Sequence, residues 1–178
     1  MRNAFLIGTK VYLRPLEEAD AAESHVWLND PEVRRTLAAR AGPYTEAMSR
    51  EWIRAVDFRT TMGFAIVVRE NDLHVGNCDL REINPIDRNA SLGIVIGRKD
   101  TWGNGFGTEA VGLLCRYAFE GLDLHRVSIS CYANNARGLR LYARLGFVVE
   151  GRRREQVFVD GRFVDEFVLG LLRDELRA

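Results

Sequence analysis

The sequence has little of what marks a disulfide-bonded, metal-binding or membrane-spanning protein. Its 178 residues include three cysteines and three histidines, with no Cys-x-x-Cys pair. The cysteines are odd in number and far apart, so they predict neither a disulfide framework nor a zinc site. No stretch approaches the roughly 20 apolar residues that a membrane-spanning helix needs. We therefore expect no metal, no membrane association and a cytoplasmic protein.

An excess of charge of either sign is also missing. The chain has 25 Lys and Arg and 25 Asp and Glu, so its formal net charge is zero. This balance argues against binding to nucleic acid through a broadly basic surface. With only four prolines and no repeat or low-complexity linker, the chain offers no obvious point of division. We expect residues 1–178 to form a single domain, a length that can bury a substantial core.

The distribution of apolar residues predicts strands and helices in a mixed order. In the first half, the expected elements are a strand over 10–16, helices over 18–28 and 46–57, and strands over 64–69, 75–83 and 89–96. In the second half, they are a helix over 105–121, a strand over 126–132, a helix over 135–145, a strand from 147 and a terminal hairpin over 157–171. The three short strands before residue 97 predict an antiparallel meander. The whole order predicts an α/β or α+β domain around a mixed sheet.

Capping residues and apolar spacing add detail to the predicted helices. Asp30 before Pro31 predicts the start of a short helix, and Thr45 predicts the N-cap of the next helix. Val26 is expected on the buried face of the first helix. The helix after residue 105 has apolar residues at i, i+3, i+4, i+7 and i+8, which are Val111, Leu114, Cys115, Ala118 and Phe119. That spacing predicts one buried stripe.

The most informative segment is residues 102–108, where three glycines alternate directly before this helix. Such a loop lets successive backbone N–H groups converge on one point, and the helix N-terminus adds about half a positive charge there. Phosphate or pyrophosphate is the natural ligand, although the glycines also fit a tight turn with no ligand. The P-loop pattern is absent. Residues 105–110 match the dinucleotide fingerprint G-x-G-x-x-A, but no acid ends the following strand to hold a ribose, which disfavours a nicotinamide cofactor.

A second segment with several candidate functional residues is the predicted helix over 135–145. Asn135, Leu139 and Tyr142 are spaced by four and three residues, so they lie along one helix face. The helix also has a separate basic stripe, formed by Arg137, Arg140 and Arg144. An amide, a phenol and a basic stripe suit a polar, phosphorylated ligand. The same residues also fit a half-buried tyrosine beside solvated arginines.

Together the two segments resemble the GNAT family of N-acetyltransferases. In that family a glycine-rich turn precedes a motif similar to the N-x-R-x-x-R-L-Y-x-x-L-G-F at residues 135–147. The resemblance covers nearly the whole chain, and residues 11–16, 27–33 and 89–94 are similar to the branch of the ribosomal-protein alanine acetyltransferases. That branch also holds relatives acting on polyamines and amino acids. The resemblance implies a mixed, mostly antiparallel central sheet of about seven strands flanked by helices.

The resemblance implies acetyl-CoA as co-substrate. By similarity, backbone N–H groups of the glycine-rich loop would wrap its pyrophosphate, and the residues concerned are Trp102, Gly103, Asn104, Gly105, Phe106, Gly107 and Thr108. The backbone of Ile94, Val95 and Ile96 would pair with the pantetheine arm like an added strand. Asn135 would hydrogen-bond this arm. One or more of the basic-stripe residues, with Arg137 first, would meet the 3′-phosphate.

Tyr142 matches the family's general acid. In direct attack, a neutral amine adds to the thioester, and the collapsing oxyanion expels a thiolate whose reference pKa is about 8.5. A phenol held by a helix can protonate that thiolate as it leaves. No covalent enzyme intermediate is needed. Catalysis through Cys131 as nucleophile is disfavoured, because a cysteine in the middle of a strand is more often part of the core.

The general base is less clear from the sequence. Asp79, Glu82 and Glu32 are candidates, and a structural role fits each of them as well. Many members of the branch have Ala-Glu-Leu-Gly where this chain has Ser91 in place of the glutamate, and a serine is no comparable base. Asp79 is the favoured candidate because its strand neighbours the expected cleft.

The leading hypothesis is acetyl transfer to a primary amine, either a protein N-terminus such as a ribosomal-protein alanine or a small amine. The alternative is a non-catalytic acyl-CoA-binding regulatory protein, and the presence of Tyr142 favours the enzyme. We expect no nucleic-acid partner, because acids flank the arginines at 152–154 and no aromatic residues alternate with them. Acids over 17–32 suit either a cationic acceptor or solvent. The final hairpin offers an edge for a homodimer, which the sequence leaves undecided.

Overall fold

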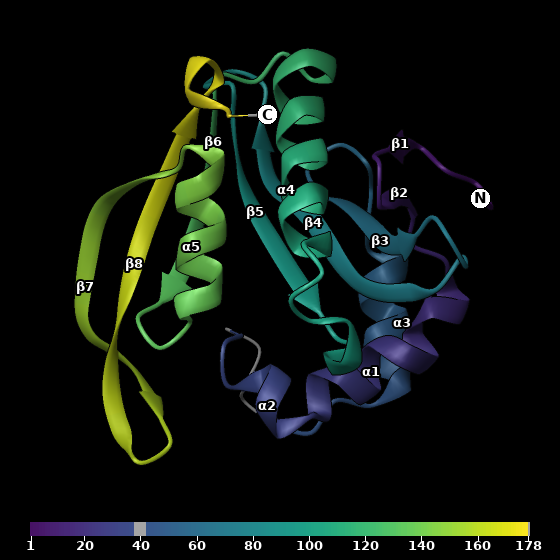
Figure 1. The fold of residues 1–178 in the computed structure, drawn as a ribbon, viewed down its shortest axis with the longest axis horizontal. Helices are drawn as coiled ribbons and strands as arrows, with labels where there is room; N and C mark the ends of the chain where they lie inside the picture. The colour runs from purple at the N-terminus through teal and green to yellow at the C-terminus, as the bar shows by residue number, and fades with distance from the viewer. Residues whose placement is uncertain (38–41, 178) are drawn as a thin grey trace.

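The computed structural model describes residues 1–37 and 42–177, and its centre is an eight-stranded sheet with helices on both faces (Figure 1). The strands are β1 (Leu6–Ile7), β2 (Val11–Pro15), β3 (Met62–Val68), β4 (His74–Asn84), β5 (Asn89–Ile96), β6 (Arg126–Tyr132), β7 (Val148–Val159) and β8 (Arg162–Leu172). The helices are α1 (Ala21–Asn29), α2 (Pro31–Arg34), α3 (Glu46–Arg54), α4 (Phe106–Arg116) and α5 (Ala136–Leu145). No helix in the described part of the chain is long and apolar enough to span a membrane.

The strand order is β1-β2-β3-β4-β5-β6-β8-β7. All neighbours are antiparallel except β5 and β6, which are parallel. The predicted mixed, mostly antiparallel sheet is therefore confirmed, as is the meander of β3, β4 and β5. The strand that the sequence does not predict is β1, whose two residues are too few to show an alternating pattern. The terminal hairpin turns at Asp160 and Gly161, both with positive φ, as its Asp-Gly pair predicts.

The predicted caps hold the helix starts in place. The Asp30 carboxylate accepts from two N–H groups at the start of α2, at 2.8 and 3.3 Å. Thr45 Oγ1 accepts from Met48 N–H at 3.2 Å at the start of α3. The expected inward position of Val26 is wrong, since that side chain is 57% exposed. Ser24 is buried instead, because its hydroxyl accepts from an amide of the sheet, Asn77 Nδ2, at 2.9 Å.

One face of the sheet carries the main core, together with α4 and α5. The predicted apolar stripe of α4 and the following turn is buried throughout, at 0–2% exposure. The opposite face is covered in part by α1 and α3. There, a Cβ on Gly63 of β3 would lie 3.4 Å from Trp52 of α3. A Cβ on Gly97, just after β5, would overlap the ring of Trp27 of α1.

The feature of the fold that positions the site is a gap between β5 and β6. The two strands pair only over Asn89–Ser91 and Arg126–Ser128, and each continues for several residues beyond. Past the Ser91–Ser128 pair the strands diverge, with α4 and α5 lying over them on the same face (Figure 1). The gap opens the middle of an otherwise continuous sheet.

Candidate active site

The glycine-rich segment forms an exposed loop that leads directly into α4. Gly103 and Gly105 have φ angles of 89° and 84°, in the left-handed region that favours glycine. Gly105 is the N-cap residue of α4. The N–H groups of Phe106, Gly107 and Thr108 therefore lie in the first turn, where a helix has no carbonyl to pair with them. This arrangement suits a phosphate or pyrophosphate group.

Trp102 holds this loop against the end of β5 and against α5. Its Nε1 donates to the carbonyl oxygen of Ile96 at 2.8 Å. The Arg137 guanidinium, in the first turn of α5, lies 3.9 Å from the centre of the Trp102 ring, a cation–π contact. A second cation reaches the loop from the β1–β2 turn, where Lys10 Nζ donates to the Asn104 carbonyl oxygen at 3.0 Å. The loop thus combines backbone N–H groups with two neighbouring cations.

Glu109 fastens the β1–β2 turn to the first turn of α4. Its carboxylate accepts from Thr9 Oγ1 at 2.7 Å, from Lys10 N–H at 2.9 Å and from Val11 N–H at 3.1 Å, and also from Thr9 N–H. Burial alone would raise the pKa of Glu109, but these hydrogen bonds lower it below its usual value. This anchor joins Lys10 to Glu109 across 99 positions of sequence and so places Lys10 Nζ beside the loop.

The backbone of β5 faces the gap at every second residue. Gly97 N–H donates to the Val75 carbonyl oxygen at 2.9 Å. In an antiparallel ladder, residues that bond to the neighbouring strand alternate with residues whose backbone points away from it. Since Gly97 bonds to β4, Val95 does so as well, whereas Ile94 and Ile96 turn their N–H and C=O groups toward β6. A Cβ on Gly107 would lie 3.5 Å from Ile96 and 3.7 Å from Ile94. The loop, the free backbone of β5 and the gap therefore meet, although one of the free groups, the Ile96 carbonyl, already accepts from Trp102.

Tyr142 lies on the buried face of α5. It is 4% exposed, and its ring packs against Phe147 with centroids 5.5 Å apart and an interplanar angle of 63°. Within the described residues its hydroxyl has no hydrogen-bond partner. Burial raises the pKa of Tyr142, and the neighbouring Cys131 and Cys115 raise it further. The phenol therefore stays protonated, as an acid must before it acts.

The other candidate residues in and near α5 either stabilise the fold or are exposed to solvent. Asn135 is the N-cap, and its Oδ1 accepts from Gly138 N–H at 2.9 Å, which leaves its amide nitrogen to donate to a ligand. The basic stripe predicted from the sequence is exposed at all three positions, Arg137, Arg140 and Arg144. Cys131 is buried at 4% exposure, and burial raises its thiol pKa to about 12. A thiol held neutral in this way is a poor nucleophile.

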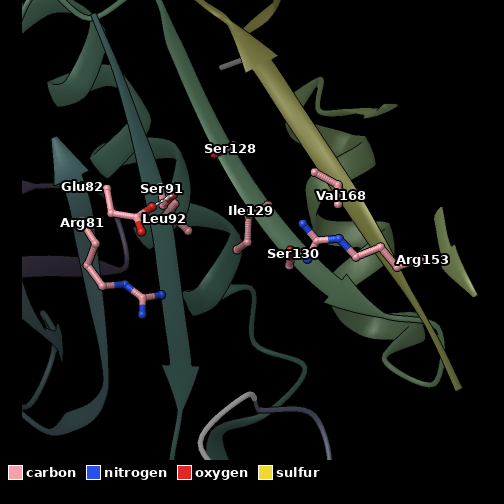
Figure 2. Close-up of a pocket in the computed structure, with 9 residues that line it drawn as sticks. All are labelled: Arg81, Glu82, Ser91, Leu92, Ser128, Ile129, Ser130, Arg153 and Val168. Atoms are coloured by element: carbon pink, nitrogen blue, oxygen red, sulfur yellow. Dashed lines mark hydrogen bonds between the residues drawn. The ribbon is translucent and has the colours of Figure 1, made fainter. Parts of the chain in front are cut away.

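A polar cavity of about 340 Å³ opens on the opposite face of the sheet, where β5 and β6 begin to separate. Figure 2 shows its lining, which comes from five strands and consists of Arg81, Glu82, Ser91, Leu92, Ser128, Ile129, Ser130, Arg153 and Val168. Leu92 and Ile129 belong to the core face, and they reach this cavity because the sheet is open between them. The cavity and the glycine-rich loop therefore lie on opposite sides of one gap.

The favoured base candidate, Asp79, lies in β4 beside this cavity but is not part of its lining. Arg81 Nε is 2.7 Å from Asp79 Oδ1. A Cβ on Gly93 would meet both side chains at 2.7–2.8 Å, so the pair rests directly on β5. Burial raises the pKa of Asp79, and the charge of Arg81 opposes that rise. Glu32 is exposed and lies 3.3 Å from Lys99 Nζ.

Several residues of the two charged patches noted in the sequence form ion pairs within the protein. In the acidic segment, Glu17, Glu18 and Asp20 form ion pairs with Arg2, Arg54 and Arg14. In the arginine cluster, Arg152 and Arg153 pair across the hairpin with Asp165 and Glu166. These ion pairs neutralise much of the charge of both patches.

Sequence reasoning identified the loop and Tyr142 but missed several residues that share the site. Lys10, Ser128 and Ser130 carry no local signal, because each is an ordinary turn or strand residue. Arg153 belongs to the arginine cluster at 152–154, which does not indicate a place beside the gap. Their common position depends on strand order and register alone. Among the described residues, no group of three or more His, Cys, Asp or Glu side chains is placed to hold a metal ion.

Comparison with known proteins agrees with this geometry. A family model described as an acetyltransferase (GNAT) domain matches residues 10–148. The uncharacterized N-acetyltransferase p20 of Bacillus licheniformis is 30% identical over 175 residues, covering 96% of this chain and 97% of that protein. A putative ribosomal N-acetyltransferase of Bacillus subtilis is 30% identical over 135 residues, covering 76% of this chain and 72% of that protein.

Among solved structures, a spermidine N-acetyltransferase from Vibrio cholerae in complex with CoA and spermine superposes with a TM-score of 0.84 at 25% identity. The match covers 94% of this chain and 98% of that chain. The family model spans well over half of the sequence, and the p20 relative matches nearly end to end. The chain therefore belongs to the GNAT family and is an acetyl-CoA-dependent N-acetyltransferase.

Proposed function

We propose that this protein transfers the acetyl group of acetyl-CoA to a primary amine by direct attack, with Tyr142 as general acid. The observation that carries the proposal is the gap between β5 and β6. On one side lie the glycine-rich loop and the buried Tyr142, which neighbours Cys131 in the part of β6 that does not pair with β5. On the other side the gap meets a polar cavity. Two substrates that enter from opposite faces meet in such a gap without a covalent enzyme intermediate.

The residues present fit the parts of acetyl-CoA. The first-turn N–H groups of α4, with Lys10 and Arg137 beside them, suit the pyrophosphate and the 3′-phosphate. The backbone of Ile94 and the N–H of Ile96 suit the amides of the pantetheine arm. Asn135 offers its amide nitrogen. When bound, acetyl-CoA supplies an activated acyl group on a thiol leaving group.

The role of Tyr142 follows from its surroundings. Burial holds the phenol neutral, and its hydroxyl is not engaged by another side chain of the described chain. It is therefore free to donate a proton to the departing thiolate. Asp79 stays the sequence-based prediction for the group that deprotonates the acceptor. A non-catalytic acyl-CoA-binding protein would have no need for a phenol held in this state.

The acceptor is a protein N-terminus or a small amine. Relatives named for a ribosomal acetyltransferase and for spermidine support both classes. A screen of N-terminal peptides, polyamines and amino acids with acetyl-CoA, read by the release of thiol, tests the proposal. Amine-dependent thiol release is the expected result, and acetyl-CoA binding without transfer to any amine would contradict it. A cytoplasmic location and a homodimer built on the final hairpin stay predictions.

A further inference from the structure

Glu82 is the carboxylate that lines the polar cavity next to the gap. It follows Arg81 in β4 at a register irregularity of the β4–β5 pair, and it has a positive φ of 54°. Ser91 Oγ of β5 donates to Glu82 Oε2 at 2.7 Å. Figure 2 shows the two side chains turned toward each other within the lining. The backbone conformation and this hydrogen bond together hold the carboxylate over β5.

The charges around the cavity leave Glu82 as its uncompensated group. Arg81 lies 2.7 Å from Asp79, and Arg153 donates to Glu166 at 2.8 Å. Each arginine of the lining thus has its own carboxylate. Glu82 has only the neutral Ser91 hydroxyl as a partner among the described residues. The charge that this cavity presents to an incoming ligand is therefore negative and lies on Glu82, which suits an ammonium group.

The position of Glu82 also suits proton removal. Ser91, to which it is bonded, is the last residue of β5 that pairs with β6, so Glu82 lies where the gap begins. An amine that enters from this face meets Glu82 before it reaches the gap. Asp79, in contrast, is held by Arg81 and does not line the cavity.

We propose that Glu82 receives the ammonium group of the acceptor and removes one of its protons, with Ser91 as the residue that positions it. This inference rests on the proposed acetyl transfer and names its acceptor-side residue. The free amine then forms the C–N bond to the acetyl carbon, and the C–S bond breaks as the thiolate takes the Tyr142 proton. The second nitrogen proton leaves as the amide forms and restores the phenol. Glu82 returns its own proton to solvent, so one proton is released per transfer.

The test compares Glu82→Gln with the wild type on two amines of similar size, propylamine and 2,2,2-trifluoroethylamine, together with the best acceptor from the screen. At neutral pH the first probe is cationic and the second is largely neutral. We expect kcat/KM to fall about 100-fold for the cationic amines and less than about fivefold for the neutral one. A general structural defect would lower all of them equally. The affinity for acetyl-CoA, measured by calorimetry, should not change.

Three further variants complete the test. Glu70→Gln is the matched control, because Glu70 is exposed in the turn at the far end of β4, and it should leave kcat/KM unchanged. Ser91→Ala should lower kcat/KM about fivefold, a smaller loss than for Glu82→Gln, and Ser91→Thr should restore it. If Asp79→Asn removes the activity while Glu82→Gln retains it, the base is Asp79 and our inference is wrong.

The outcomes separate this inference from the proposed function. If the wild type transfers acetyl to no amine, the proposed function fails and this inference fails with it. If the wild type is active and Glu82→Gln keeps kcat/KM within threefold on cationic amines, only the role of Glu82 is overturned. An equal loss on both probe amines would also overturn it, because it would show a structural effect.

Discussion

Replacing Tyr142 by phenylalanine removes one hydroxyl and little else. The ring is 4% exposed and packs on Phe147, and both features survive the change. The hydroxyl has no hydrogen-bond partner among the described residues, so its loss breaks no hydrogen bond within that part of the chain. We therefore expect the free energy of unfolding to change by less than about 1 kcal/mol.

The effect on activity should be much larger. A positioned acid typically contributes about 100- to 10,000-fold to the rate, so kcat should fall at least about 100-fold. That factor is about 2.7 kcal/mol of transition-state stabilisation. Because burial raises the pKa of Tyr142, the wild type should not lose kcat through ionisation of this phenol between about pH 7 and 10.

The assay is thiol release at saturating acetyl-CoA with the best amine of the screen, beside urea unfolding of the same samples. Tyr12→Phe is a matched control, since Tyr12 is 1% exposed and its hydroxyl donates to Asp72 at 3.1 Å. It should lose about 1 kcal/mol of stability and keep kcat. A Tyr142→Phe enzyme with kcat within twofold of wild type would refute the acid role.

Three other predictions concern stability and acetyl-CoA affinity. Asp20→Asn should cost about 3 kcal/mol in urea unfolding at pH 7, because it breaks a buried ion pair with Arg14 at 2.7 Å. Burial alone would raise the Asp20 pKa, but the hydrogen bonds from Arg14 and from the Glu17 N–H, together with the nearby positive charges, outweigh it and lower the pKa. The advantage of wild type is therefore present above about pH 4 and shrinks as the pH falls further. Gly146→Ala should cost at least about 2 kcal/mol, because φ is 102° and the new Cβ would overlap the Glu175 carbonyl oxygen. Equal urea midpoints for mutant and wild type would contradict this. Trp102→Ala should raise KM for acetyl-CoA about tenfold, or about 1.4 kcal/mol, with kcat nearly unchanged, and an unaltered KM would remove Trp102 from the site.

Much of the fold could be predicted because the relevant signals are local. The stripe of α4 repeats within eight residues, and the caps Asp30 and Thr45 act within three. The bounds of β5 and β6 match the prediction, because each strand is a short run of apolar or β-branched residues between turns. The bounds of an element differ from the prediction where no cap marks its end. The helix expected over 46–57 stops at Arg54, and Asp57 instead binds the N–H groups of the turn that follows.

The candidate site also has one part that could be predicted from the sequence and one part that could not. The sequence by itself determined the glycine-rich loop and the position of Tyr142 on a helix face, because both depend on contacts within a few residues. Only the tertiary structure shows the cavity that we propose as the acceptor side. The pairing of β5 with β6 ends at Ser91, and the register irregularity of β4 presents Glu82 to that serine. Strand order and register bring together residues that are far apart in the chain. No local pattern of residue types encodes which of these distant residues become neighbours.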